Sequence, residues 1–222
     1  MFIHKHPYKP FIPKQATKLI VGTLPPPRFT TGNLKPDDVD FCYGSRDGQL
    51  WRILDQLFDL NLVYENTKYA IDQRKDFLKS QGIGICDMVE SALREKVDAS
   101  DIGMQDVVLR NLLGHIKVHP NIDTLLFTGG NSKNGPEYFF RKHLKLNGLN
   151  LTPINQEVPR IHIFDIKDKK NMTRTIRTVS LTAPSGSANR AVGSMPLYKQ
   201  IKQRNPSFTT FDFRVMQYRE FF

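Results

Sequence analysis

Four polar segments carry most of the side chains that can do chemistry, and each directly follows a short apolar run. They are Gly22-Thr-Leu-Pro25, Cys86-Asp-Met88, Thr128-Gly-Gly-Asn-Ser132 and Ala183-Pro-Ser-Gly-Ser-Ala-Asn-Arg190. Asp87 and Asn131 offer hydrogen-bond acceptors and donors suited to a small polar ring. The backbone N–H groups of the last segment can approach a phosphate closely, because glycine and small side chains leave them accessible. These residue types favour a ligand that has a polar ring and a phosphate.

The apolar runs before these segments have the length and composition of buried strands. They cover residues 18–23, 82–87, 123–130 and 177–184, with a weaker fifth run at 161–166. Helical patterns alternate with them over residues 49–60, 104–118, 135–146 and 189–203. The alternation predicts a three-layer α/β/α fold around a central, mainly parallel four-stranded sheet. Ligand sites in such sheets lie beyond the carboxyl ends of the strands, so the polar segments are expected to meet at one edge.

Two of the predicted helices carry proline or glycine at informative positions. Pro136 occupies a first helical position, where its missing N–H costs nothing. Gly193 and Pro196 lie inside the pattern at 189–203, and they predict that this helix is irregular.

Length and composition fit one domain over residues 1–222. The chain has 39% hydrophobic and 24% charged residues, which excludes a mainly collagenous, coiled-coil or disordered protein. Its apolar runs are too short for a membrane span, and no signal-peptide pattern is present. Cys42 and Cys86 are too few for a disulfide framework or a four-cysteine zinc site. We therefore expect buried thiols in a reducing compartment, no metal, and a cytoplasmic protein without a membrane partner.

The positive charge is concentrated near the two ends of the chain. The formal net charge is +10, of which residues 1–19 contribute +4 and residues 167–222 contribute +8, leaving −2 for the middle. We accordingly expect a basic N-terminal arm (1–16) and a basic C-terminal segment (205–222). Such an excess favours a polyanionic partner, with nucleic acid first, although a soluble basic surface has the same composition.

Three segments carry a family likeness as well. Gly22-Thr-Leu-Pro25 follows the first strand, Tyr43-Gly-Ser-Arg-Asp-Gly-Gln-Leu-Trp51 leads into a helix, and Pro184-Ser185 follows the last strand. In these motifs the chain resembles the uracil-DNA glycosylase superfamily, mainly its mismatch-specific and hypoxanthine-excising branches. The strand that ends in Asp87 is similar to the family's strand ending in an aspartate, and the likeness covers roughly residues 17–205.

The resemblance implies a glycosylase that flips a deaminated base, uracil or hypoxanthine, out of DNA and hydrolyses its N-glycosidic bond in base-excision repair. It implies that Tyr43 stacks on the flipped base and that Asp87 or Asn131 reads its edge. The other residues that it places at the substrate are Gly22, Thr23, Leu24 and Gly44. The residues that it places on the DNA strand are Pro184, Ser185, Gly186, Ser187, Asn189 and Arg190. It further implies a monomer that needs no metal and no nucleotide cofactor.

Three positions depart from the family pattern, and all three concern catalysis. Leu24 stands where the mismatch branch has an asparagine, Gly48 where the hypoxanthine branch has one, and Ala183 where some branches have a histidine. Asp47, next to Gly48, carries a carboxylate that can position water, so it is the predicted catalytic residue. If Asp47 does not take this role, the chain is expected to bind DNA with altered or no cleavage.

The predicted site residues also have structural alternatives. Asp47 lies in Arg46-Asp-Gly48, a good turn sequence. Asp87 can instead cap a following helix, and Tyr43 can be a core aromatic, as we expect for Trp51 on the apolar face of its helix.

Other classes of site have weaker support in the sequence. The acidic residues of 37–40 are expected to form a solvated loop. His115 and His119 are spaced like metal ligands but have no acidic third ligand nearby. Gly129-Gly-Asn131 with Lys133 lacks the spacing of a triphosphate-binding loop, and the Gly-x-Ser-x-Gly elbow of an α/β hydrolase is missing.

Overall fold

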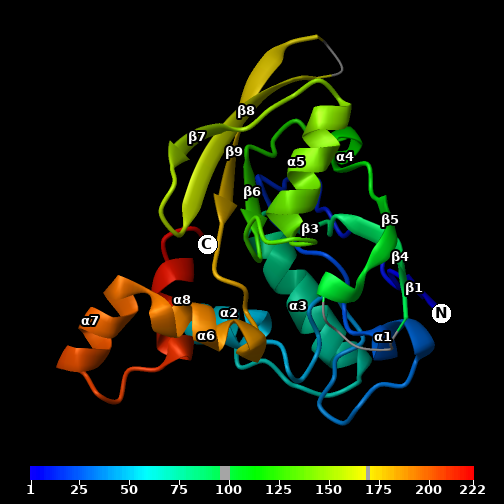
Figure 1. The fold of residues 1–222 in the computed structure, drawn as a ribbon. Helices are drawn as coiled ribbons and strands as arrows, with labels where there is room; N and C mark the ends of the chain where they lie inside the picture. The colour runs from blue at the N-terminus through cyan, green and yellow to red at the C-terminus, as the bar shows by residue number, and fades with distance from the viewer. Residues whose placement is uncertain (96–100, 169–170) are drawn as a thin grey trace.

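The main sheet has six strands in the order β3-β2-β6-β9-β8-β7, in a computed structural model that describes residues 1–95, 101–168 and 171–222 (Figure 1). Four of them run parallel to one another: β3 (Ile83–Ile85), β2 (Lys18–Val21), β6 (Thr124–Phe127) and β9 (Thr173–Ser180). The antiparallel strands β8 (Arg160–Lys167) and β7 (Thr152–Asn155) extend the sheet beyond β9. The four predicted strands are confirmed, but a four-stranded sheet is wrong, because β8 pairs with β9 along its whole length.

A smaller antiparallel sheet has the order β1-β4-β5. Its strands are β1 (Phe2–Lys5), β4 (Val89–Arg94) and β5 (Gln105–Leu109), and η1 (Asp101–Gly103) precedes β5. The predicted helix over 104–118 is therefore wrong in its first half, since Val108 pairs with Ser91 of β4 and only α4 (Leu112–Val118) is helical. β-branched residues favour such a half-exposed strand. The expected N-terminal arm is built into this sheet, and its His4 and His6 are buried.

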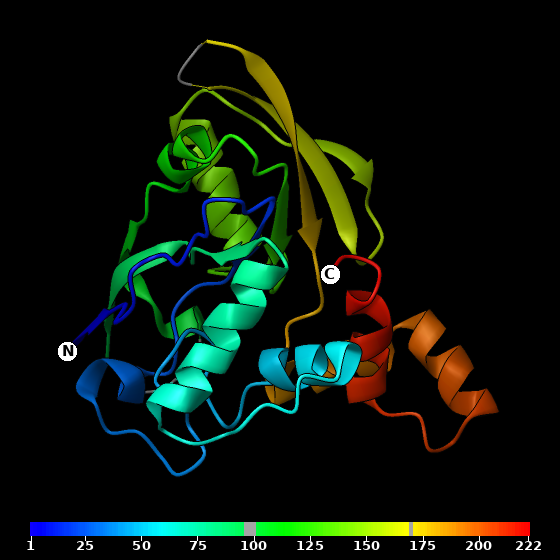
Figure 2. The same cartoon turned by 180° about the vertical axis from the view of Figure 1, so that it is seen from behind.

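Helices cover both faces of the main sheet (Figures 1 and 2). One face is covered by α2 (Leu50–Phe58), α3 (Lys68–Ser80) and α8 (Thr210–Tyr218), and the other by α4 and α5 (Pro136–Leu146). Successive side chains of a strand point to opposite faces. Accordingly, Leu19 and Val21 belong to the core cluster under α4 and α5, whereas Ile20 belongs to the cluster under α2 and α3.

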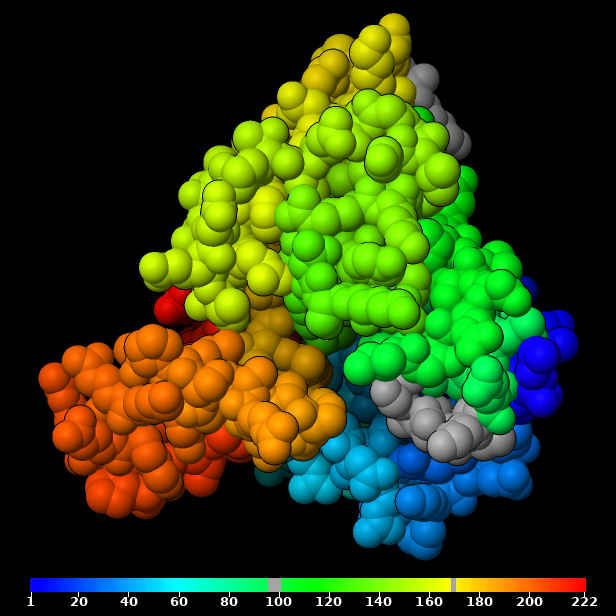
Figure 3. Space-filling model, in the orientation of Figure 1, coloured from blue at the N-terminus to red at the C-terminus, as the bar shows by residue number. Residues whose placement is uncertain are grey.

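The C-terminal part of the chain contains a projecting helical lobe. The irregular helix predicted over 189–203 is two helices, α6 (Asn189–Ser194) and α7 (Pro196–Arg204), which follow η2 (Gly186–Ala188). Pro196 starts α7 because it cannot donate the hydrogen bond that would continue α6. α7 has no buried residue and projects from the body of the protein in Figure 3. Near the N-terminus, α1 (Pro27–Thr31) ends at Gly32, which has a φ of 74°.

Half of the +8 net charge of residues 167–222 lies on this lobe, and none of it lies on the last segment. Residues 186–204 contain four cationic residues and no acidic one, namely Arg190, Lys199, Lys202 and Arg204. The segment 205–222 contains two arginines and two acidic residues, so its expected basic character is wrong. No helix in the described part of the chain is both long and apolar enough to cross a membrane.

Candidate functional site

The carboxyl ends of the four parallel strands meet at one edge, as the sequence predicts. Val21 pairs with Phe127, and Phe127 pairs with Ser180, so the segments that follow β2, β6 and β9 leave the sheet at one level. A cavity of about 750 Å³ opens there. Nine of the predicted site residues line it: Thr23, Leu24, Tyr43, Gly44, Asp47, Asp87, Pro184, Ser185 and Ser187.

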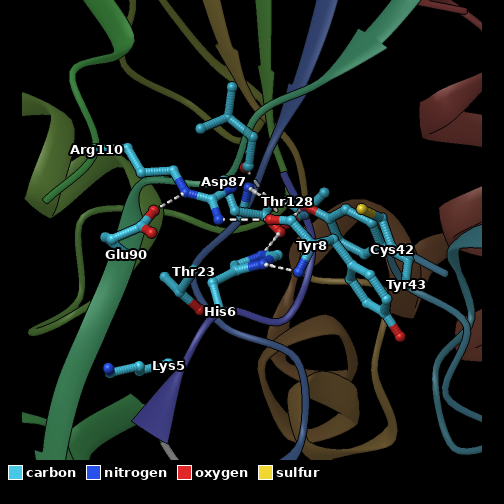
Figure 4. Close-up of polar contacts among 12 residues, drawn as sticks. Lys5, His6, Tyr8, Thr23, Cys42, Tyr43, Asp87, Glu90, Arg110 and Thr128 are labelled. Carbon is cyan, nitrogen blue, oxygen red and sulfur yellow. Dashed lines mark hydrogen bonds and ion pairs between the residues drawn. The ribbon is translucent and has the colours of Figure 1, made fainter. Parts of the chain in front are cut away.

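Asp87 is the centre of a hydrogen-bond network in the cavity wall (Figure 4). Its Oδ1 accepts hydrogen bonds from the Gly22 N–H and the Tyr43 hydroxyl, each at 2.7 Å. Its Oδ2 lies 2.9 Å from Nε2 of His6. The Tyr8 N–H donates to Nδ1 of His6 at 3.2 Å, which leaves Nε2 to carry the proton that points at Asp87. Residues from three separate segments thus fix this carboxylate, which is 5% exposed.

The alternative in which Asp87 caps a helix is wrong, because β4 follows it. Its negative charge also acts on Tyr43. Burial first, and then the charge of Asp87, raise the pKa of the Tyr43 phenol well above its usual range. Tyr43 therefore stays protonated and donates its hydrogen bond, so Asp87 presents a fixed acceptor to the cavity.

The backbone at Tyr43 and Gly44 is folded tightly against the strand ends. Tyr43 has a φ of 59°, which is rare for an aromatic residue and costs roughly 1–3 kcal/mol. A Cβ atom on Gly44 would collide with the carbonyl oxygen of Val39. Tyr43 lines the cavity, whereas Trp51 is 2% exposed and donates its indole N–H to the Cys42 carbonyl, which confirms its core position. Cys42 is a buried free thiol, as predicted.

Asp47 lies on the exposed side of the cavity. Its side chain is 65% exposed, and Oδ2 accepts a hydrogen bond from Arg28 at 3.2 Å. Arg28 also binds Asp38 through two nitrogens, at 2.7 and 2.9 Å. The expectation of a solvated acidic loop is wrong for Asp38, whose side chain has no exposed surface. Burial alone would raise the pKa of Asp38, but hydrogen bonds from Arg28 and from two backbone N–H groups lower it below its usual value.

The loop after β9 is joined to the segment that carries Asp47. Gly48 and Ser185 form an antiparallel bridge, and the Gln49 N–H donates to the Pro184 carbonyl at 2.8 Å. Ser187 is also held within the loop, since its hydroxyl lies 2.7 Å from that of Ser185. Two motifs that are more than 130 residues apart in sequence therefore form one rim of the cavity.

Arg214 of α8 holds this loop through hydrogen bonds, and no sequence motif indicates this role of Arg214. Its guanidinium donates to the carbonyls of Ala183 and Ser185, at 2.8 and 2.9 Å. It also donates to Oδ1 of Asn189 at 3.0 Å and to the Thr210 carbonyl at 3.0 Å. Arg214 is fully buried, so it positions the loop without contacting the cavity.

Five predicted site residues lie outside the cavity lining: Gly22, Asn131, Gly186, Asn189 and Arg190. Gly22 still belongs to the site, through the N–H that it donates to Asp87. Asn131 is exposed, and its neighbour Ser132 lines the cavity instead. Asn189 is exposed, but its side-chain oxygen is bound by Arg214. Gly186 and Arg190 are exposed and do not line the cavity.

Asp101 of η1 also lines the cavity and was not anticipated from the sequence. Oδ1 of Asp101 accepts a hydrogen bond from the Thr23 hydroxyl at 2.9 Å. Burial raises the pKa of Asp101 to about 6, and the charge of Asp87 adds to the rise, while the Thr23 hydrogen bond and the charge of Arg94 oppose it. No motif surrounds Asp101, and the strand that comes after it, β5, is not predicted from the sequence either.

In the described parts of the chain, no group of three or more His, Cys, Asp or Glu side chains is arranged to hold a metal ion. Comparison of the chain with protein-family models, with curated proteins and with solved structures gives no match.

Proposed function

We propose that the protein is a monofunctional DNA glycosylase that excises a deaminated base, uracil or hypoxanthine, in base-excision repair. The observation that carries the proposal is the meeting of the three family-like motifs around one cavity, with Asp87 in its wall. Motifs that are separate in sequence come together at the strand ends of a mainly parallel sheet, where ligands of α/β proteins bind. The proposed scaffold is the three-layer α/β/α arrangement of that family, extended here by β7 and β8.

The cavity supplies what the recognition of a flipped base requires. Tyr43 offers an aromatic ring, and ring stacking tolerates any planar base. Asp87 offers a fixed acceptor for a ring N–H, which both uracil and hypoxanthine carry. The rim formed by Pro184, Ser185 and Ser187 can contact the strand around the flipped nucleotide, next to the cationic lobe of 186–204.

Asp47 is the residue to which we assign positioning of the attacking water. It lines the cavity, and its carboxylate is oriented by Arg28. An oriented carboxylate can hold a water molecule by accepting one of its hydrogen bonds.

The test is a base-release assay on labelled oligonucleotides that carry one uracil or one hypoxanthine, in duplex and in single-stranded form. The expected result is an abasic site that is cleaved by alkali, with no product from the undamaged oligonucleotide. Asp87→Asn should reduce product formation at least tenfold, because an amide N–H would face the donors around it. Asp37→Asn, an exposed carboxylate outside the cavity lining, serves as the matched control and should match the wild type. Absence of product at enzyme excess would contradict the proposal.

The second candidate is a protein that binds DNA without cleaving it. The observation that favours it is the apolar character of two positions, since Leu24 and Ala183 line the cavity where the family has an amide and, in some branches, a histidine. This candidate predicts binding of damaged DNA that weakens steeply with salt, with no abasic product under any condition.

A further inference from the structure

We propose that Asp101 is the general base that takes the proton of the attacking water, a role that lies outside the three family-like motifs. The inference rests on the proposed glycosylase function. Asp101 is placed in the cavity by η1, a segment that follows β4 of the smaller sheet. Its neighbour Ile102 lines the same cavity.

The position of Asp101 is fixed from its backbone and from its side chain. The Asn134 side chain donates to the Asp101 carbonyl at 2.9 Å, and the Met104 N–H donates to it at 3.1 Å. The Thr23 hydroxyl holds Oδ1 at 2.9 Å. Asn134 is buried and has a φ of 63°, a left-handed conformation that asparagine adopts more readily than most residues. A base that is fixed before substrate binds loses little freedom when it acts.

The charges around Asp101 suit a base that works near neutral pH. Partial removal from water destabilises its ionised form, and the nearby carboxylate of Asp87 destabilises it further. The Thr23 hydroxyl and the Arg94 guanidinium stabilise the ionised form. The balance holds the pKa of Asp101 at about 6, so the group is ionised at pH 7 and still binds a proton readily.

The other two carboxylates of the cavity are already engaged by neighbouring groups. Asp87 accepts hydrogen bonds from Gly22, Tyr43 and His6. Asp47 is 65% exposed and ion-paired with Arg28, so solvent and the guanidinium both compensate its charge. Asp47 can orient water, whereas Asp101 is better suited to receive its proton.

The chemical step balances without any further reactant. The water oxygen forms a bond to C1′ of the flipped nucleotide, and the C1′–N bond breaks with its electron pair going to the base. The water proton passes to the Asp101 carboxylate and from there to solvent. The released base anion takes a proton from solvent.

The experiment measures single-turnover base release between pH 5 and 8, with DNA affinity measured separately. The expected wild-type rate falls tenfold per pH unit below a midpoint near pH 6, because protonated Asp101 cannot act as a base. Asp101→Asn keeps an oxygen for the Thr23 hydrogen bond and should lose about 10²–10⁴-fold in rate, with DNA affinity unchanged. Asp106→Asn, an exposed residue outside this cavity's lining, is the matched control and should keep the wild-type profile.

Thr23→Val adds a second readout that a purely structural role for Asp101 would not give. Loss of the hydroxyl removes a group that lowers the pKa of Asp101, so the midpoint of the rate profile should move to higher pH. This inference alone would be overturned if the wild type releases base and the Asp101→Asn variant does so at a rate within tenfold of it, with the same pH profile. A wild type that releases no base overturns the proposed function and this inference together.

Discussion

Asp87 and Arg214 are two buried ionic side chains that organise opposite parts of the site. Asp87 gathers His6, Gly22 and Tyr43 through donated N–H and O–H groups. Arg214 gathers the loop after β9 through carbonyl oxygens and one side-chain amide. The decisive difference is that Asp87 lines the cavity, whereas Arg214 has no exposed surface and does not line it.

The comparison separates two ways of using a buried charge. Both residues join chain segments that are distant in sequence, because one ionic group can satisfy several hydrogen-bonding partners at once. Asp87 keeps contact with the cavity and can therefore act on a ligand as well as on the fold. Arg214 acts on the fold alone. Changes at the two positions should therefore separate effects on stability from effects on ligand binding.

The largest effect is expected from Arg214→Ala. The substitution leaves buried carbonyls without a donor and opens a cavity, so the free energy of unfolding should fall by about 3–5 kcal/mol. Arg219→Ala, an exposed arginine next to the same helix, is the control and should change it by less than about 0.5 kcal/mol. Urea unfolding followed by circular dichroism measures both. Equal stabilities for the two variants would show that Arg214 does not hold the loop.

Asp87→Asn should lower the stability of the protein less than Arg214→Ala does, and it should weaken ligand binding. The amide keeps the shape of the side chain, but its NH₂ faces a donor from His6 or Tyr43, so the expected loss is about 1–3 kcal/mol. Binding of an oligonucleotide with a flipped, damaged base should weaken at least tenfold when the variant is measured well below its unfolding midpoint. If the Asp87→Asn variant binds the oligonucleotide as tightly as the wild type under these conditions, then Asp87 does not act on the ligand and does not differ from Arg214 in this respect.

Asp101→Asn should raise the stability of the protein near neutral pH. The pKa of Asp101 in the folded protein is about 6, above the ordinary 3.8, so the folded state binds this proton more tightly than the unfolded state. Stability from this group is complete below pH 4 and is lost as the pH rises to about 6. One pKa unit corresponds to about 1.4 kcal/mol, and partial solvent exposure reduces the effect, so the variant should gain roughly 1–2 kcal/mol at pH 7.

The gain should disappear below pH 4, because there the wild-type carboxyl group is neutral, like the amide of the variant. Chemical unfolding at pH 4 and pH 7 gives the two values. The same gain at both pH values would mean that the carboxylate charge is not its cause.

Much of the sheet could be predicted from the sequence, because strands buried on both faces have continuous apolar runs. Strands β2, β3 and β6 are of this kind, whereas β9 has consecutive buried residues only over 178–180. β1, β4, β5 and β7 were missed, since half-exposed strands mix polar and apolar residues. Helix α3 was missed for a similar reason: its buried side chains include Arg74, which does not register as apolar.

The sequence predicted the loop residues that line the site, but not the buried residues that hold those loops in place. Asp87 and Tyr43 could be found because they directly follow a strand or belong to a motif. His6 and Arg214 could not, since they reach the site from the two ends of the chain through tertiary contacts. Asn131 was predicted from its place after β6, but the turn there directs Ser132 to the cavity and buries Asn134 instead.

The smallest effect on stability is expected on the outer side of the loop that Arg214 supports. Arg190 and Lys199 are exposed on α6 and α7, so replacing both with alanine should change the free energy of unfolding by less than about 0.5 kcal/mol. If these residues contact phosphates, DNA affinity should fall severalfold, and the slope of log affinity against log salt should decrease by about 2. Lys145→Ala on α5 is the control, because it removes an exposed cation from another part of the surface. An unchanged salt slope in the double variant would mean that the cationic lobe does not meet the DNA backbone, and the loop held by Arg214 would then shape the cavity rim only.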